Sequence, residues 1–351
     1  MKTEDISELK KEARALKLSY TSDAAKGYTR QRSKGGFTYY DTGGEEIIVE
    51  EELARIRSLV IPPAWEHVWI CAKANGHLQA TGIDAAGRKQ YKYHPQWSRF
   101  RNDRKHSRMA EFAEVLPLIR QRVEKDLQEK EFSKNKVVAL AVSVIDKTHI
   151  RVGNAIYAKL YGSFGLTSLR NKHLKVEGNK MIISFRGKKG VQQEVILTQR
   201  RLVNMLKKLK DIPGQELFQF YDADGSKKTL DSGAINEYIE MCTGKDFTAK
   251  DFRTWWGTVT AAAYLATLPP CSLKSDIHKN LVATLDAVAD KLGNTRAVCK
   301  KYYVHPQLLQ HYEEGKLSRY LDQLQTADNT ADELLSSEEK VILQFMRKEC
   351  C

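Results

Sequence analysis

The sequence predicts an α+β protein with a small β-rich N-terminal domain and a larger, mainly helical second domain. Between residues 27 and 97, short aromatic and β-branched runs alternate with Gly-Gly, Asn-Gly and Ala-Gly turns, which is typical of a small sheet. From about residue 107, apolar residues recur at three- and four-residue spacing, which indicates helices. A chain of 351 residues also exceeds what one core usually supports. We therefore expect domains over residues 1–106 and 107–351.

The charge balance favours a polyanionic partner. The chain has 57 Lys and Arg against 44 Asp and Glu, a formal net charge of +13, and such an excess suits nucleic acid or an anionic surface. No apolar run approaches the ~20 residues of a membrane span, and the N-terminus lacks the apolar core of a signal peptide. The six cysteines show no Cys-x-x-Cys spacing, so we expect neither a zinc site nor a disulfide framework, in a reducing intracellular compartment.

The end of the β-rich region combines cations, aromatics and an amide. Residues 87–93 read GRKQYKY, and the arginines and lysines of residues 99–108 follow with only Asp103 to offset them. Such a mixture suits phosphate contacts together with contacts to base edges, so it predicts binding to DNA or RNA. The alternative is a solvated basic strand and linker. The candidate binding residues are Arg88, Lys89, Gln90, Tyr91, Lys92 and Tyr93.

The second domain is expected to contain one sheet among its helices. Residues 173–197 have the pattern of a β-meander, with turns at 178–179 and 187–190. Residues 247–268 form a long, largely apolar helix whose first turns carry Arg253, where a cation opposes the helix dipole. After residue 313 the chain becomes mixed and, over 327–340, acidic, which we interpret as a peripheral helix or tail.

Two adjacent tyrosines lie in the basic segment LGNTRAVCKKYYVHP, residues 292–306. Tyrosine can be a nucleophile, but a phenol with a pKa of about 10 needs surrounding cations and a substrate whose developing charge they stabilise. The alternative is a surface amphipathic helix with tyrosine packed at its edge. The residues themselves do not decide between Tyr302 and Tyr303.

Other polar residues complete a candidate site for phosphodiester chemistry. Attack on a phosphodiester builds negative charge on its non-bridging oxygens, and two guanidiniums match that charge without a metal. A lysine in a glycine-flanked turn can deliver a proton to the departing alkoxide. Singly, an arginine in a helix usually forms a surface salt bridge, and two lysines in a turn are usually exposed to solvent. The candidates besides a tyrosine are Arg151, Lys188, Arg253 and Asn294.

Six segments occur in the order GRKQYKY, IRVGN, SFGLTSLRNKH, FRGKKG, TAKDFRTWWGT and LGNTRAVCKKYYVHP. Together they closely resemble the type IB DNA topoisomerases, in particular the small poxvirus-like enzymes found in bacteria, over residues 27–312. By position, the resemblance implies a catalytic pentad of Arg151, Lys188, Arg253, Asn294 and Tyr303, with the tyrosine before Val-His-Pro as nucleophile. Asn294 stands where the poxvirus enzymes have histidine, and a neutral amide can donate to a phosphate oxygen but cannot shuttle a proton.

The resemblance also implies an architecture and a reaction. A β-rich DNA-clamp domain and a helical catalytic domain, built around a three-stranded sheet and ending in a helical tail, would close around double-stranded DNA. The enzyme would nick one strand through a 3′-phosphotyrosyl link, let the end rotate and reseal it, with no ATP, metal or other cofactor. Gln90, Tyr91 and Tyr93 would contact the DNA. We expect a monomer with no membrane association and no obligate protein partner, in the bacterial cytoplasm with the nucleoid.

Two other classes of DNA-binding protein share part of this pattern. Tyrosine recombinases share this fold and chemistry, but they place His-x-x-Arg where this chain has Lys250-Asp251-Phe252-Arg253, and they usually carry a helical N-terminal domain. A basic architectural DNA binder would explain the charge and the aromatics. It would not explain five catalytic residue types in the correct order.

Overall fold

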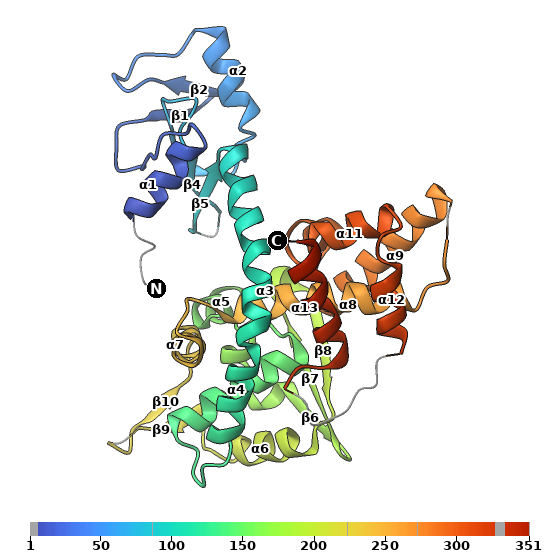
Figure 1. The fold of residues 1–351 in the computed structure, drawn as a ribbon. Coiled ribbons are helices and arrows are strands. Elements are labelled where there is room, and N and C mark those ends of the chain that lie inside the picture. The colour runs from blue at the N-terminus through green and yellow to red at the C-terminus, as the bar shows by residue number, and fades with distance from the viewer. Residues whose placement is uncertain (1–5, 86, 223, 272, 327–333, 351) are drawn as a thin grey trace. The chain divides into compact units, whose positions relative to one another are not determined.

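The computed structural model describes residues 6–350 apart from 86, 223, 272 and 327–333. The chain divides into two compact units, Met1–Lys105 and His106–Cys351, which are described separately (Figure 1). The N-terminal unit contains a sheet, and the C-terminal unit is mainly helical around a second, three-stranded sheet. The α+β fold class predicted from the sequence is therefore confirmed.

The N-terminal unit is built on a five-stranded antiparallel sheet in the order β2-β1-β3-β4-β5. Ile56, Val68, Ile70 and Ala80 form the small core between the sheet and a helix. Strand β5 lies at the edge of the sheet and pairs with β4, with Thr81 opposite Tyr91. The elements are α1 (Ile6–Ala15), β1 (Tyr28–Ser33), β2 (Gly36–Tyr40), α2 (Glu50–Ser58), β3 (Glu66–Ile70), β4 (Leu78–Ile83) and β5 (Lys89–Tyr93).

The long helix α3 (Pro95–Asp126) begins well before residue 107, where the sequence pattern predicted the change to helices. The basic run of residues 99–108, for which a solvated linker was the alternative to nucleic-acid binding, is therefore helical. Pro95 is in the first helical position, which proline tolerates, and arginine and lysine are good helix formers. In the N-terminal unit, Trp97 packs with Ala13 and Leu18, and this apolar anchor extends the helix into the basic run.

The C-terminal unit surrounds helix α4 (Lys134–Thr148), which is buried along most of its length. The three-stranded antiparallel sheet has the order β6-β7-β8 and coincides with the β-meander predicted from the sequence. The remaining elements up to residue 266 are α5 (Ala155–Tyr161), β6 (Leu174–Glu177), β7 (Lys180–Arg186), β8 (Gln192–Leu197), α6 (Arg200–Lys210), β9 (Gln219–Tyr221), β10 (Lys227–Thr229), α7 (Ser232–Thr243) and α8 (Ala249–Ala266).

The last helix packs into the core of this unit. The later elements are α9 (Lys274–Leu292), α10 (Arg296–Tyr302), α11 (Pro306–Glu313), α12 (Ser318–Gln325) and α13 (Ser337–Glu349). Helix α13 lies against α8 and α12, with Ile342, Phe345 and Met346 buried (Figure 1). The interpretation of the segment after 313 as a peripheral helix or tail is thus wrong for α13, because its apolar face fills the core. Within the acidic stretch 327–340, residues 327–333 lie outside the described part of the chain.

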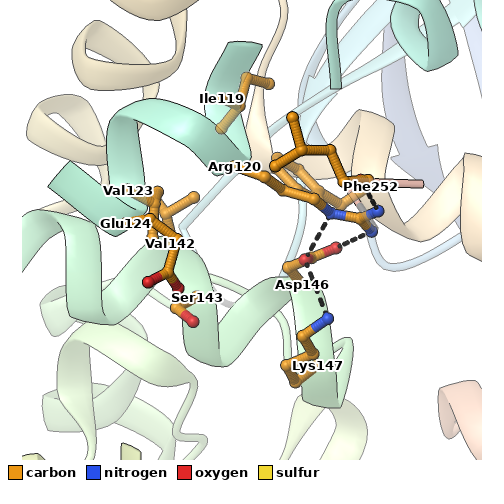
Figure 2. Close-up of a pocket in the computed structure, with 10 residues that line it drawn as sticks. Ile119, Arg120, Val123, Glu124, Val142, Ser143, Asp146, Lys147 and Phe252 are labelled. Carbon is orange, nitrogen blue, oxygen red and sulfur yellow. Dashed lines mark hydrogen bonds and ion pairs between the residues drawn. The ribbon is translucent and has the colours of Figure 1, made fainter. Parts of the chain in front are cut away.

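A buried ion-pair cluster joins α3, α4 and α13. Arg120 donates to Asp146 at 2.8 and 2.9 Å and to Glu339 at 2.6 and 2.9 Å, and Glu339 also accepts from Trp255 Nε1 of α8 at 3.0 Å. Figure 2 shows Arg120 and Asp146 facing each other in a pocket of about 400 Å³. Burial alone lowers the pKa of Arg120, but the two carboxylates outweigh it and raise the pKa. The Arg120 charge in turn lowers the pKa of Asp146, so this pair stays ionised, and the Trp255–Glu339 hydrogen bond connects the cluster to α8.

Candidate active site and nucleic-acid interface

Arg151 lies on the loop after helix α4, and the segment around Gly165 and Leu166 fixes the backbone of this loop. Its carbonyl accepts a hydrogen bond from the N–H of Leu166 at 2.8 Å. Gly153, with φ of +88°, packs directly on Gly165, and a Cβ built on Gly153 would lie 2.8 Å from Gly165 Cα. Glycine is required at both positions because no side chain fits between the two backbones. This crossing holds the base of the Arg151 side chain.

Arg151 and Asn294 are in direct contact. Arg151 Nη2 donates to Asn294 Oδ1 at 2.6 Å and to the carbonyl of Gly293 at 3.0 Å. Gly293 ends α9 in the left-handed region, with φ of +57°, and so turns the chain toward Arg151. Because Asn294 Oδ1 faces the guanidinium, Nδ2 is directed elsewhere. This buried nitrogen has no hydrogen-bond partner among the described residues.

Arg253 is buried in α8, with 5% of its surface exposed. Nη1 donates to the carbonyl of His149, and Nη2 donates to the carbonyl of Leu292 at 2.9 Å. Its Nε has no hydrogen-bond partner within the described part of the chain. Burial, and then the charge of Arg151, lower the pKa of Arg253 to about 10, so the side chain is still charged at neutral pH. Main-chain carbonyls, rather than carboxylates, hold this cation and leave its charge uncancelled.

Tyr303 lies beside Arg253, whose guanidinium carbon is 5.3 Å from the centre of the phenol ring. Thr258, fully buried in α8, donates from Oγ1 to the Tyr303 carbonyl at 3.2 Å and accepts from the His305 N–H at 3.0 Å. A Cβ on Gly257 would lie 2.8 Å from the Tyr303 carbonyl oxygen. The backbone of Tyr303 is therefore fastened to the helix that carries Arg253. Tyr302, in contrast, is 39% exposed next to Lys301.

Lys188 is the one sequence-predicted catalytic residue that does not contact the other four in the described part of the chain. It lies in the turn Lys188–Gly190 between β7 and β8 and is exposed. Its ammonium has no hydrogen-bond or ion-pair partner among the described residues. The turn is nevertheless close to the Asn294 loop, because the side chain of Gln193 would meet a Cβ built on either Gly187 or Gly293.

Several residues around this site were not predicted from the sequence. Thr258, Gly257 and Gln193 lie against the backbone of residues distant in the chain, and the sequence does not reveal such contacts. His149 ends α4 in the left-handed region, and its ring lies against that of Trp256, tilted by 33° with 3.7 Å between ring centres. The Gly-Thr pair at the end of TAKDFRTWWGT lies inside a largely apolar helix. This pair is the one sequence signal that could have indicated Gly257 and Thr258.

The buried histidines predict a pH dependence of stability. Burial lowers the pKa of His149 to about 3 and outweighs the opposing charge of Asp146, and burial followed by the charge of His311 lowers the pKa of His305 to about 4. Below pH ~6.5 these histidines are protonated in the unfolded chain but remain neutral in the folded chain. Stability therefore decreases as the pH is lowered. We expect the free energy of unfolding to drop by about 1.4 kcal/mol per pH unit per histidine between pH ~6.5 and ~4.

Denaturant unfolding at several pH values measures this slope. His305→Asn keeps a side-chain acceptor for the Gln307 N–H, which His305 Nδ1 now caps at 3.2 Å, and should remove one histidine's share of the slope. Replacement of exposed His278 by Asn is the matched control. An unchanged slope in the His305 variant would contradict the assignment.

The candidate nucleic-acid residues divide between the two faces of β5. Lys89, Tyr91 and Tyr93 share the more exposed face, while Gln90 and Lys92 are half-buried on the other. The rings of Tyr91 and Tyr93 stack with centres 6.1 Å apart. Gln90 and the two tyrosines therefore do not point the same way. Because β5 is an edge strand, side chains from both of its faces border the outer edge of the sheet, where a ligand could contact them.

The basic residues near β5 have acidic partners that the local sequence did not indicate. Arg88 pairs with Asp84 at 2.6 Å, and Lys89 pairs with Asp23 at 2.5 Å. In α3, Arg104 pairs with Glu12, and Arg108 pairs with Asp246 at 2.5 Å. The expectation of little acidic compensation is therefore wrong. Most of these carboxylates are distant in sequence and are brought close by the fold.

Comparison with known proteins gives matches to two family models. The family model described as the catalytic core of eukaryotic DNA topoisomerase I matches residues 94–331, and that of the N-terminal domain of bacterial DNA topoisomerase IB matches residues 36–84. Among solved structures, a XerH site-specific recombinase bound to a palindromic difH substrate has a TM-score of 0.37 and 18% identity, covering 57% of this chain and 50% of its own. That likeness is too distant to bear on the fold.

Two viral proteins are similar over most of the chain. DNA topoisomerase 1B of Acanthamoeba polyphaga mimivirus is 31% identical over 297 residues, which covers 82% of this chain and 88% of the viral protein. DNA topoisomerase 1B of vaccinia virus (strain Copenhagen) is 27% identical over 274 residues, covering 78% and 82% respectively. On the match to the catalytic core and the extent of the mimivirus similarity, this chain belongs to the type IB DNA topoisomerase family.

Proposed function

We propose that this enzyme relaxes supercoiled duplex DNA by cutting one strand through a 3′-phosphotyrosyl intermediate, allowing rotation and resealing the strand. The observation that carries the proposal is the group of donors around Tyr303. Arg253 Nε and Asn294 Nδ2 are buried donors without partners in the described part of the chain, and Arg151 lies against Asn294. Buried donors without partners are costly, so such donors on Arg253, beside the Tyr303 ring, and on Asn294, held by Arg151, support a site for an anionic ligand.

The proposed cleavage step uses Tyr303 Oη to attack the scissile phosphorus. The new bond joins Tyr303 to the 3′ phosphate, and the bond from phosphorus to the 5′ oxygen breaks. Negative charge grows on the non-bridging oxygens, where Arg151, Arg253 and the Asn294 amide would donate hydrogen bonds. The two arginines supply the positive charge near the phosphate, which supports a reaction that needs neither ATP nor a metal. Resealing is the same step in reverse, with the 5′ hydroxyl as nucleophile.

Lys188 is proposed to give a proton to the departing 5′ oxygen, while the phenol of Tyr303 releases its proton to solvent water, from which the lysine is reprotonated. Its place in an exposed turn, without a partner among the described residues, supports a group that reaches the leaving oxygen once DNA is bound. The linkage through Gln193 places this turn close to the Asn294 loop. In this proposal the lysine acts on the leaving group, and the arginines act on the phosphate.

We also propose the assignment of residues 1–106 as a DNA clamp and of residues 107–351 as the catalytic domain with its C-terminal helices. The cations and stacked tyrosines of β5 support contact with double-stranded DNA by the clamp. The proposed enzyme is a monomer without an obligate protein partner, acting at the nucleoid in the bacterial cytoplasm. No helix of the described residues is long and apolar enough to span a membrane.

Relaxation should weaken steeply as salt rises, because binding to phosphates releases counterions and gives log K a slope near −0.9 per neutralised phosphate. Replacing Lys89 or Lys92 by Ala should flatten the slope by roughly one unit each. Replacing Lys316, which is paired with Glu314 in the other unit, is the control. The slopes come from duplex-binding titrations at several salt concentrations. An unchanged slope would mean that the lysine faces solvent rather than phosphate.

Thr258→Val should slow cleavage by about 10- to 100-fold, because small displacements of a reacting group have costs of this size. The substitution keeps the shape of the side chain but removes the donor to Tyr303 and the acceptor for His305. Duplex affinity should not change, and the variant should lose about 1–3 kcal/mol of stability. Single-turnover cleavage and binding titrations measure both effects. Thr258→Ser, which keeps the hydroxyl, should be near normal; equal defects in both variants would contradict the positioning role.

Incubation of supercoiled plasmid with the protein in EDTA, without ATP, tests the proposed function. A ladder of relaxed topoisomers from a single plasmid, with no second DNA site, is the expected result. Strand exchange that requires paired sites would identify a recombinase instead. Binding without any change in linking number would identify an architectural DNA binder and overturn the proposal.

A further inference from the structure

Asp84, at the end of β4, holds two of the candidate DNA-contacting residues. Its Oδ2 accepts from Arg88 Nε at 2.7 Å and from Gln90 Nε2 at 2.9 Å, and its Oδ1 accepts from the Arg88 main-chain N–H at 3.0 Å. Arg88 Nη2 is 2.6 Å from the same carboxylate. The Asp84 side chain is only 14% exposed, whereas that of Arg88 is 46% exposed. The carboxylate thus lies beneath the two residues.

This contact fixes the direction of the Gln90 amide. An ionised carboxylate only accepts hydrogen bonds, so the NH2 group of Gln90 must face Asp84 and its Oε1 must face away. A glutamine on a strand edge without such a partner can rotate and offer either its donor or its acceptor to a base. Arg88 neutralises Asp84, so this orientation does not leave an unpaired negative charge near a DNA backbone.

We propose that Asp84 is a positioning residue for base recognition, which makes Gln90 read DNA with its acceptor Oε1. In the major groove, the exocyclic amines of adenine and cytosine are donors, whereas guanine and thymine present acceptors at the equivalent positions. Gln90 should therefore select adenine or cytosine at one position of the bound site. This inference rests on the proposed contact of β5 with duplex DNA.

Selection of bound sequences from randomised duplexes tests this without strand cleavage, using the full-length protein with Tyr303→Phe. We expect enrichment of adenine or cytosine at one position, and Gln90→Ala should abolish that enrichment. Asp84→Asn should abolish it too, because an amide can accept or donate and frees Gln90 to rotate. The double variant should be no less selective than Gln90→Ala alone.

Base analogues in the selected duplex test whether Gln90 accepts a hydrogen bond from the base, without any change to the β5 strand. Removing the exocyclic amine, with purine in place of adenine or 2-pyrimidinone in place of cytosine, should weaken binding about five- to tenfold. Replacing adenine by 7-deazaadenine should have no effect. Asp84→Glu, which is still only an acceptor, should retain the response to amine removal, and Asp84→Asn should lose it.

The outcomes separate this inference from the proposed function. If the plasmid is relaxed but Gln90→Ala alters the selected sequence while Asp84→Asn does not, the positioning role of Asp84 is wrong. If binding weakens on loss of a base acceptor such as guanine N7, rather than on loss of an amine, the assignment of Gln90 as a hydrogen-bond acceptor is wrong. Failure of plasmid relaxation with the base preference intact would remove the proposed reaction and leave this inference standing. Absence of any base preference would overturn it.

Discussion

Tyr303→Phe should abolish the covalent protein–DNA adduct completely while leaving duplex binding intact. The phenol oxygen is the proposed attacking atom, and its removal deletes the bond-forming step rather than slowing it. The ring remains, so its packing beside Arg253, 5.3 Å from the guanidinium carbon, should persist. Denaturing electrophoresis of protein mixed with labelled DNA detects the adduct, and titration of the same DNA measures affinity.

Tyr302→Phe is the matched control because it makes the same chemical change one residue away. Tyr302 is 39% exposed, and its main chain does not carry the contacts that Thr258 makes to Tyr303. This variant should keep most of the relaxation activity. An adduct that survives in the Tyr303 variant, or disappears in the Tyr302 variant, would reverse the assignment of the nucleophile.

Lys188→Ala should slow cleavage by about 10²- to 10⁴-fold, the range expected when a general acid is lost. An alkoxide leaves poorly unless it is protonated, whereas a thiolate leaves without a proton. On DNA with sulfur in place of the bridging 5′ oxygen, the Lys188 defect should therefore largely vanish. Single-turnover cleavage of the two substrates measures the difference.

Two controls separate proton donation from electrostatic stabilisation. Arg151→Ala should be impaired by about 10²- to 10³-fold on both substrates, because charge still develops on the non-bridging oxygens. Lys189→Ala should be near normal on both. If sulfur leaves the Lys188 variant as impaired as before, Lys188 positions or stabilises the phosphate, and the proton comes from another group.

The sequence predicted the parts of the fold that depend on local pattern. The β-meander at residues 173–197 and the helix at 247–268 were recognisable because periodicity and turn residues are local signals. The start of α3 was missed because the packing of Trp97 onto Ala13 and Leu18 extends the helix into the basic run. The sequence predicts a peripheral helix in place of α13 because it does not show which surface covers the apolar face of that helix.

The sequence predicted which residues belong to the candidate site. It did not predict the contacts between them. Arg151, Lys188, Arg253, Asn294 and Tyr303 were identified through ordered motifs, and their catalytic roles stay predictions. The contacts of Arg151 with Asn294, and of Thr258 with Tyr303, join positions far apart in the chain. The pairing of Lys89 with Asp23 depends on the fold in the same way. Hydrogen bonds between distant segments leave no periodic signal in a sequence.

Identification of the DNA-linked peptide tests the central claim most directly. The protein is mixed with duplex DNA, denatured to trap the intermediate and digested with protease, and the peptide that carries nucleotide is identified by mass spectrometry. We expect the nucleotide on Tyr303, joined through the phosphate at the 3′ end of the cut strand, with a free 5′ hydroxyl on the other fragment. Attachment to another residue, linkage through a 5′ phosphate, or relaxation without any covalent peptide would contradict the mechanism.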